Sequence, residues 1–112
     1  MGKNLGEFEQ VVLFSILRLE DDAYGLAIRD SIEDRTGRRV SPGAIYTTLG
    51  RLAERGIVSA QVERSRDLPG RRRKYYRLTA AGARQLRDSF EAIRSAADGV
   101  TGRLHELSGG EA

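Results

Sequence analysis

One short stretch, residues 41–56, carries polar side chains that could hydrogen-bond to a binding partner. Its sequence is SPGAIYTTLGRLAERG. Ile45, Leu49 and Leu52 recur at helical spacing, so we expect them to face a core. The remaining residues then face outward, where small side chains allow close approach and polar groups contact bases or phosphates. This outward set is Ser41, Gly43, Ala44, Thr47, Thr48 and Arg51.

Tyr46 lies next to this set and admits two interpretations. Its hydroxyl could reach a DNA phosphate, or its ring could pack against a neighbouring hairpin. We include Tyr46 among the candidate DNA contacts and leave both interpretations open.

The middle of the chain is a second candidate for chemistry with a polyanion. Residues 38–74 hold ten Lys and Arg against three Asp and Glu, so this segment carries +7 and the remainder of the chain carries −4. Such an uneven distribution is typical of a surface that faces nucleic acid, although a run of charges is also often merely solvated. The candidate contacts here are Arg64, Arg66, Arg71, Arg72, Arg73 and Lys74.

The groups that enzymes and metal sites need are missing or isolated. The chain has no cysteine and a single histidine, His105. Adjacent acidic pairs such as Asp21 and Asp22 suit capping and solvation better than acid–base catalysis. No glycine-rich phosphate loop links a strand to a helix. We therefore expect no enzyme, no metal and no cofactor. With no secretory leader and no apolar run near the ~20 residues of a membrane helix, we expect a cytoplasmic protein.

Hydrophobic spacing and caps predict the elements that position these residues. Residues 6–19 are apolar on more than one helix face, so part of this helix should meet a second chain. Asp21 or Asp22 is expected to cap a second helix. Ser41 caps the third helix, and Gly56 ends it.

Two runs rich in β-branched and aromatic residues follow, and they flank a Pro69-Gly70 turn signal. They predict a hairpin with a long basic tip. Tyr75 and Tyr76 alternate across its second strand, so one should be in the core and the other exposed.

The last predicted element is a helix over 80–107, capped by Thr79. Its apolar residues alternate steps of three and four, which is typical of a coiled-coil seam between two chains. Gly99 and Gly102 should weaken its last turns. Together with the first helix, the seam predicts a homodimer. Its predicted interface comprises Phe8, Val11, Val12, Leu86, Phe90, Ile93, Ala97, Val100, Leu104 and Leu107.

This order of elements predicts a winged helix-turn-helix, mostly α with a small β-hairpin, plus a C-terminal dimerisation helix. The predicted boundaries are 1–79 for a DNA-binding domain, 80–107 for the dimerisation helix and 108–112 for a disordered tail. In this fold the third helix enters the major groove, and the hairpin reaches a neighbouring groove or the backbone.

Three motifs resemble those of the PadR-type transcriptional regulators. They are Tyr-Gly at 24–25, Ser-x-Gly-x-Ile-Tyr-x-x-Leu-x-Arg-Leu at 41–52, and Arg-Lys-x-Tyr-x-Leu-Thr-x-x-Gly at 73–82. The match covers nearly the whole chain, and its length resembles the short branch of the family, with one C-terminal helix. Thr47 replaces the usual proline and Ala53 replaces a frequent glutamate, so the operator preference of better-known members does not carry over.

The resemblance implies a homodimer that regulates transcription, usually as a repressor, by binding double-stranded operator DNA. A two-fold dimer predicts an inverted repeat in that operator. Some short-branch members bind flat aromatic or cationic drugs between their subunits, which implies a small aromatic effector. The residues that would line such a pocket would serve equally well as interface core: Phe8, Val11, Val12, Phe14 and 90–97. An alternative from a different class is a winged-helix protein–protein interaction adaptor, which would need an apolar, weakly charged third helix and hairpin.

Overall fold

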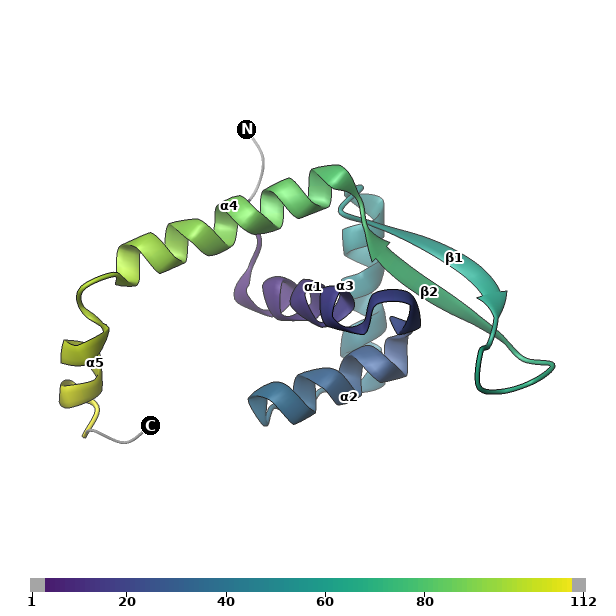
Figure 1. The fold of residues 1–112 in the computed structure, drawn as a ribbon, viewed down its shortest axis with the longest axis horizontal. Helices are drawn as coiled ribbons and strands as arrows, with labels where there is room; N and C mark the ends of the chain where they lie inside the picture. The colour runs from purple at the N-terminus through teal and green to yellow at the C-terminus, as the bar shows by residue number, and fades with distance from the viewer. Residues whose placement is uncertain (1–3, 110–112) are drawn as a thin grey trace.

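The computed structural model describes residues 4–109, and the predicted fold class is confirmed (Figure 1). Helices α1 to α3 form a body, from which a hairpin and an arm of two helices leave on opposite sides. Within the described residues, no helix is long and apolar enough to cross a membrane. The elements are α1 (Glu7–Leu19), the 3₁₀ turn η1 (Glu20–Asp22), α2 (Gly25–Thr36), α3 (Pro42–Glu54), β1 (Val58–Arg64), β2 (Arg72–Leu78), α4 (Ala80–Ala97) and α5 (Thr101–Leu107).

The core lies where α1, α2, α3 and the base of the hairpin meet. The inward stripe predicted for α3 is confirmed, since Ile45, Leu49 and Leu52 are fully buried. Val12 is 0% exposed and Leu86 is 3% exposed, and both belong to the same core. Their prediction as dimer contacts is therefore wrong, because each already packs inside its own chain.

Local capping chemistry sets the beginnings of α3 and α4. The Ser41 hydroxyl accepts from the Ala44 N–H at 3.1 Å, and the Thr79 hydroxyl accepts from the Gly82 N–H at 2.9 Å. Both predicted caps are confirmed. Gly56 follows α3 with a φ of +72°, a backbone conformation in which glycine is favoured.

The predicted cap of α2 is wrong. Asp21 and Asp22 lie in η1, and α2 begins only at Gly25, after an extended Tyr24. Tyr24 is held extended because it forms an isolated β-bridge with Tyr75 in β2. The helix cannot begin before this pairing ends.

Both tyrosines of β2 are buried, which corrects the prediction that one would be exposed. Tyr75 and Tyr76 are each 5% exposed. They point to opposite faces of the hairpin, but both faces are covered near its base. Tyr76 packs into the core. On the other face the Tyr24 ring meets Tyr75 edge-on, with centroids 5.9 Å apart.

The helix predicted over 80–107 is interrupted at one of the two glycines that were expected to weaken it. It is divided at Gly99, whose φ of +83° lies outside helical geometry, into α4 and α5. Gly102, by contrast, lies inside α5. The predicted tail falls partly outside the described residues: 110–112 are not described, while Ser108 closes α5 with its N–H donating to the Leu104 carbonyl at 3.0 Å.

The α4–α5 arm leaves the body without covering its own apolar residues. The radius of gyration is 16.1 Å, against about 13 Å for a compact chain of this length. Four large apolar side chains along the arm are 53–73% exposed: Ile93, Val100, Leu104 and Leu107.

Candidate nucleic-acid interface

Helix α3 presents most of its predicted polar set to solvent. Ser41, Gly43, Ala44, Thr47 and Arg51 are all exposed. Ser41, Gly43, Ala44 and Thr47 lie in the N-terminal half of the helix, where its dipole favours a negatively charged partner, whereas Arg51 lies in its last turn. The Arg51 side chain forms no ion pair with any residue of 4–109, so its charge is free to meet one.

Thr48 does not belong to this surface. It is 9% exposed and lies on the inward side of α3. The reason is helical geometry: Thr48 comes three residues after Ile45 and four before Leu52, so it shares their face. Its prediction as a DNA contact is corrected accordingly.

Tyr46 packs against the first residue of α2. A Cβ built on Gly25 would lie 2.5 Å from Tyr46 Cε1 and 2.7 Å from its hydroxyl oxygen, so the ring lies directly on the glycine backbone. The ring is also close to Tyr76: burial first, and the neighbouring Tyr46 second, raise the pKa of Tyr76. Tyr46 nevertheless stays 50% exposed, which leaves its outer edge open to a partner.

The strand register sorts the basic residues of the hairpin, which we call the wing, onto two faces. In the antiparallel pairing, Val62 lies opposite Lys74, and Arg64 lies opposite Arg72. These residues share the face that carries Tyr76, since side chains two apart point the same way. Arg64, Arg72 and Lys74 are exposed, and none pairs with an acidic residue in the described part of the chain.

Arg73 points to the opposite face and is already engaged. Its guanidinium pairs with Asp67 and lies 3.8 Å from the centroid of the Tyr24 ring, and its side chain is only 20% exposed. A hydrogen bond from the Ser65 hydroxyl, and then Arg73 itself, lower the pKa of Asp67. Arg73 therefore differs from the other predicted contacts, because its side chain fastens the wing turn to the start of α2.

Further ion pairs that the sequence did not reveal fix the wing to η1 and the end of α3 to α1. Arg77, on the same face as Arg73, donates to Asp21 at 3.1 Å. Arg66 comes within 3.9 Å of Asp21 but keeps a side chain that is 53% exposed. Arg55 at the end of α3 donates to Glu9 of α1 at 3.0 Å. These pairs join residues far apart in sequence, so no local pattern could have predicted them.

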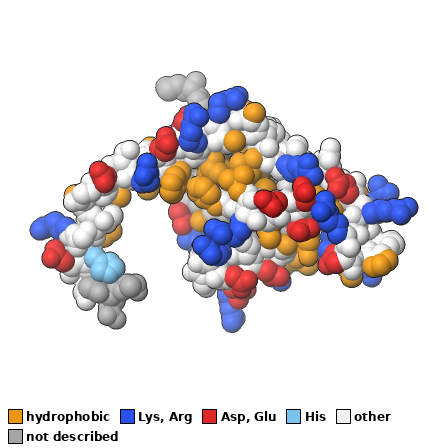
Figure 2. Space-filling model, viewed as in Figure 1, with side chains coloured by type: hydrophobic (Ala, Val, Ile, Leu, Met, Phe, Trp, Pro, Cys, Tyr) orange, Lys and Arg blue, Asp and Glu red, His pale blue; other side chains and the backbone are white. Residues whose placement is uncertain are grey.

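Arg71 completes the predicted wing set, and its exposed side chain is free of ion pairs within 4–109. Figure 2 shows Lys and Arg side chains gathered at the end of the wing, away from the arm. Among the predicted contacts, the exposed cations thus lie on α3 and the outer wing, which is the arrangement a polyanion would meet.

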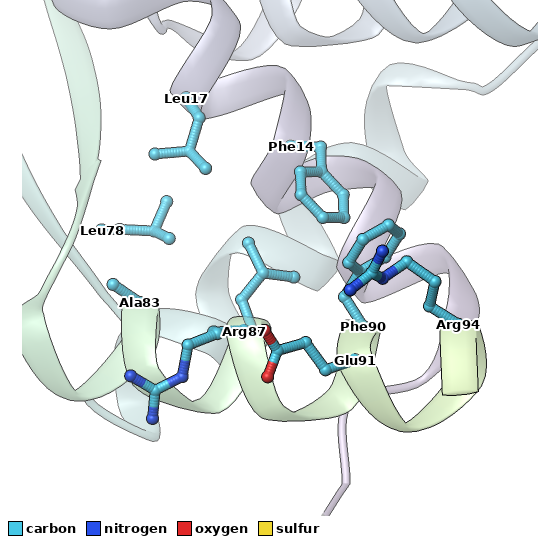
Figure 3. Close-up of a pocket in the computed structure, with 9 residues that line it drawn as sticks. Phe14, Leu17, Leu78, Ala83, Arg87, Phe90, Glu91 and Arg94 are labelled. Atoms are coloured by element: carbon cyan, nitrogen blue, oxygen red, sulfur yellow. The ribbon is translucent and has the colours of Figure 1, made fainter. Parts of the chain in front are cut away.

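A separate apolar hollow of about 380 Å³ lies between α1 and α4 (Figure 3). Phe14 and Phe90 meet edge-on in it, with ring centroids 5.3 Å apart, and Leu17 lies beside them. Arg87, Glu91 and Arg94 also line it. Of the residues predicted to line an effector pocket, Phe14 and, within 90–97, Phe90, Glu91 and Arg94 do so. Val12 is in the core instead, and the half-buried Phe8 and Val11 pack against it.

Among residues 4–109, no three histidine or acidic side chains gather as metal ligands would. The described surface offers cations and hydrogen-bond donors on α3 and the wing, and an apolar hollow beside the arm.

Comparison with known proteins shows similarity at the level of sequence and of fold. A family described as "Transcriptional regulator PadR-like family" matches residues 13–88. A transcriptional regulator of Mycobacterium tuberculosis is 39% identical over 75 residues, which is 67% of each chain.

Solved structures share the architecture. A PadR family transcription regulator from Clostridium difficile R20291 has a TM-score of 0.70 at 25% identity, over 87% of this chain and 98% of that one. A PadR-like transcriptional regulator from Bacillus cereus has a TM-score of 0.74 at 26% identity, over 87% and 90%.

Proposed function

The chain belongs to the PadR-like family of transcriptional regulators, and we propose that it acts as a homodimeric repressor that recognises one operator sequence. We propose no catalytic activity for this chain, because its exposed groups suit binding better than catalysis. The observation that carries the proposal is the sorting of cations on the wing. Arg64, Arg72 and Lys74 share one unpaired, exposed face, whereas Arg73 and Arg77 on the other face are neutralised by acidic neighbours.

The two parts of this surface would have different roles. Thr47 and Arg51 of α3, in the major groove, would distinguish base pairs by hydrogen bonds to their edges. The wing cations, with Ser41 and the backbone near Gly43 and Ala44 at the start of α3, would hold phosphates and set the position of the protein. This division makes α3 the source of specificity and the wing a source of affinity.

A second copy of the chain would cover the apolar residues of the arm. Phe90 is 43% exposed and Ile93 is 64% exposed on α4, and Leu104 and Leu107 on α5 are more exposed still. Several exposed apolar side chains on one arm mark an interface rather than a free surface. Ala97 and Val100, at the junction of the two helices, complete this set. Two-fold symmetry would then space the two α3 helices by about one DNA turn, roughly 34–36 Å, on an inverted repeat.

An effector would bind in the hollow between α1 and α4. Its aromatic walls, Phe14 and Phe90, suit a flat apolar ring. The charged side chains that also line it could pair with a charged substituent: Arg87, Glu91 and Arg94. Because the hollow adjoins the exposed apolar residues of the arm, a ligand in it would change how two copies pack and hence the spacing of their α3 helices.

The test is binding to a duplex with the DNA immediately upstream of the coding region, against a scrambled duplex, at several salt concentrations. Tight binding to the first alone, with two protected half-sites, is the expected result. Equal and steeply salt-dependent binding to both would reduce the protein to an electrostatic DNA binder. If a confirmed dimer bound neither, the adaptor alternative would replace this proposal. Transcription in vitro from the same DNA then distinguishes repression from activation.

A further inference from the structure

The turn between β1 and β2 is closed by its own hydrogen bonds. The Ser65 N–H donates to the Arg71 carbonyl at 2.8 Å, and the Arg71 N–H donates to the Leu68 carbonyl at 3.1 Å. The Ser65 hydroxyl accepts from the Leu68 N–H at 3.1 Å and donates to Asp67 at 2.9 Å. Asp67 in turn is paired with Arg73. The turn therefore has a defined shape before any partner arrives.

The apex of this turn is apolar and faces solvent. Leu68 is 42% exposed, Pro69 is exposed, and Gly70 turns the chain back with a φ of +80°. The apex lies at the end of the wing opposite to the base of the hairpin (Figure 1), and Leu68 is not part of the core cluster. A leucine held in water in this way gains free energy only when a partner buries it.

Exposed arginines surround the apolar apex. Arg71 lies within the turn, and Arg64 and Arg72 form the last strand pair below it. Arg66 also lies within the turn, where its half-exposed side chain comes within 3.9–4.0 Å of Asp21 and Asp22. Figure 2 shows Lys and Arg side chains together with a hydrophobic patch at this end of the molecule. An apolar tip inside a ring of cations matches the minor groove of DNA, whose phosphates line both walls and whose floor consists of sugars and base edges.

In the proposed DNA-binding function, the wing reaches the groove next to the half-site read by α3. Resting on that function, we propose that Leu68 and Pro69 enter the minor groove there as an apolar wedge that bends the duplex. An anionic membrane also attracts an apolar tip ringed by cations. The position of the wing favours DNA, because the face with Arg72 and Lys74 continues to Tyr76, which neighbours Tyr46 on α3. One DNA duplex can therefore meet α3 and the wing together.

The proposed wedge predicts a preference for certain base pairs in the DNA, although it forms no hydrogen bonds to the bases. The guanine N2 amino group projects into the minor groove of every G·C pair and would obstruct the apex, whereas A·T pairs leave the floor open. The wing position should therefore prefer A·T, and it should also tolerate inosine in place of guanine, since inosine lacks that amino group and keeps the major-groove acceptors.

The experiment compares the wild-type dimer with Leu68→Ala on the upstream duplex. The matched control is Leu26→Ala, because Leu26 on α2 is also a leucine with 42% exposure. Affinity and its salt dependence are measured by fluorescence anisotropy, and bending by energy transfer between dyes on the duplex ends. A second duplex carries A·T or inosine·C in place of each G·C pair under the footprint of the wing. Vesicles of anionic phospholipid are tested in parallel.

We expect L68A to lose about tenfold in affinity, the scale set by burial of one leucine side chain, and to bend the duplex less, at an unchanged salt slope. Wild type should gain affinity with inosine, and L68A should not. Unchanged affinity and bending in L68A, with wild type bound normally, would overturn the wedge alone. Failure of wild type to bind any duplex would overturn the wedge together with the proposed function. Binding to vesicles that requires Leu68, without an effect on DNA bending, would assign the apex to membranes instead.

Discussion

Arg64 and Arg72 lie directly opposite each other in the wing, as the last pair of the strand register before the turn. Like charges in this position destabilise a hairpin. Neither arginine has an acidic partner in residues 4–109. The repulsion is relieved when a polyanion supplies the missing negative charge. The pair therefore destabilises the free protein and stabilises a DNA complex.

Arg72→Ala should therefore act in opposite directions on DNA binding and on stability. We expect weaker binding to every duplex and a slope of log affinity against log salt that is shallower by about one, because one phosphate contact is lost. The free protein should keep its free energy of unfolding or gain roughly 0.2–1 kcal/mol, since the repulsion is gone. Anisotropy over a salt series and denaturant unfolding measure the two effects. An unchanged salt slope would remove Arg72 from the interface.

Arg73→Ala, one residue further along β2, should behave differently. Its charge is already paired with Asp67 and covered by Tyr24, so we expect the salt slope to stay as in wild type. The turn should instead loosen, and faster amide hydrogen exchange at residues 65–71 would report it. Equal losses of salt slope in R72A and R73A would show that the division of the wing into two faces has no functional meaning.

The same turn should respond to acid. The Ser65 hydroxyl and Arg73 lower the pKa of Asp67 below its ordinary value of 3.8. A carboxyl group with a lowered folded-state pKa stabilises the fold above its unfolded pKa, and loses that effect as the pH falls through the folded pKa. Protection of the turn amides should thus be constant above about pH 5 and decline below pH 4. Asp67→Asn should abolish this pH dependence, and a decline that persists in D67N would have to come from another group.

Those predictions depend on which face of the wing each residue occupies, and the sequence alone indicates this only in part. Alternation along β2 was readable, and it places Arg72 and Arg73 on opposite faces. Which face meets the body was not readable, because it depends on the bridge between Tyr24 and Tyr75. Likewise the Tyr-Gly motif and Tyr46 were visible separately, but only the fold shows that the Tyr46 ring lies on Gly25.

Caps, by contrast, could be predicted because they are local. Ser41 and Thr79 each bond to an N–H three residues on, so the sequence contains both partners. The two glycines of the arm illustrate the limit of such local patterns. Gly99 breaks the helix and Gly102 does not, and propensity assigns both the same cost.

Two glycine substitutions should distinguish a glycine that is required because a Cβ would clash from one that only lowers helix propensity. A Cβ on Gly82 would lie 2.0 Å from the Ile57 carbonyl oxygen, a backbone atom that cannot turn aside. We expect Gly82→Ala to lower the free energy of unfolding by about 3 kcal/mol. Gly102 in α5 has nothing within 4 Å, so Gly102→Ala should raise helix stability by up to about 1 kcal/mol. Thermal unfolding of both variants checks this, and similar transition temperatures would refute the close approach at Gly82.

The arm provides a test of assembly that is independent of DNA. Ile93 is 64% exposed in the single chain and Leu86 is 3% exposed, although both belong to the stripe predicted for one interface. Ile93→Asp should therefore leave each subunit folded but dissociate the dimer, because a carboxylate cannot be buried unpaired between two apolar surfaces. Leu86→Ala should lower the free energy of unfolding by about 2–5 kcal/mol through a core cavity and leave folded molecules dimeric. Sedimentation velocity over a concentration series, with circular dichroism on the same samples, separates the two effects. A dimer of I93D as tight as that of wild type would exclude the arm as the interface, and the inverted-repeat operator would lose its structural basis.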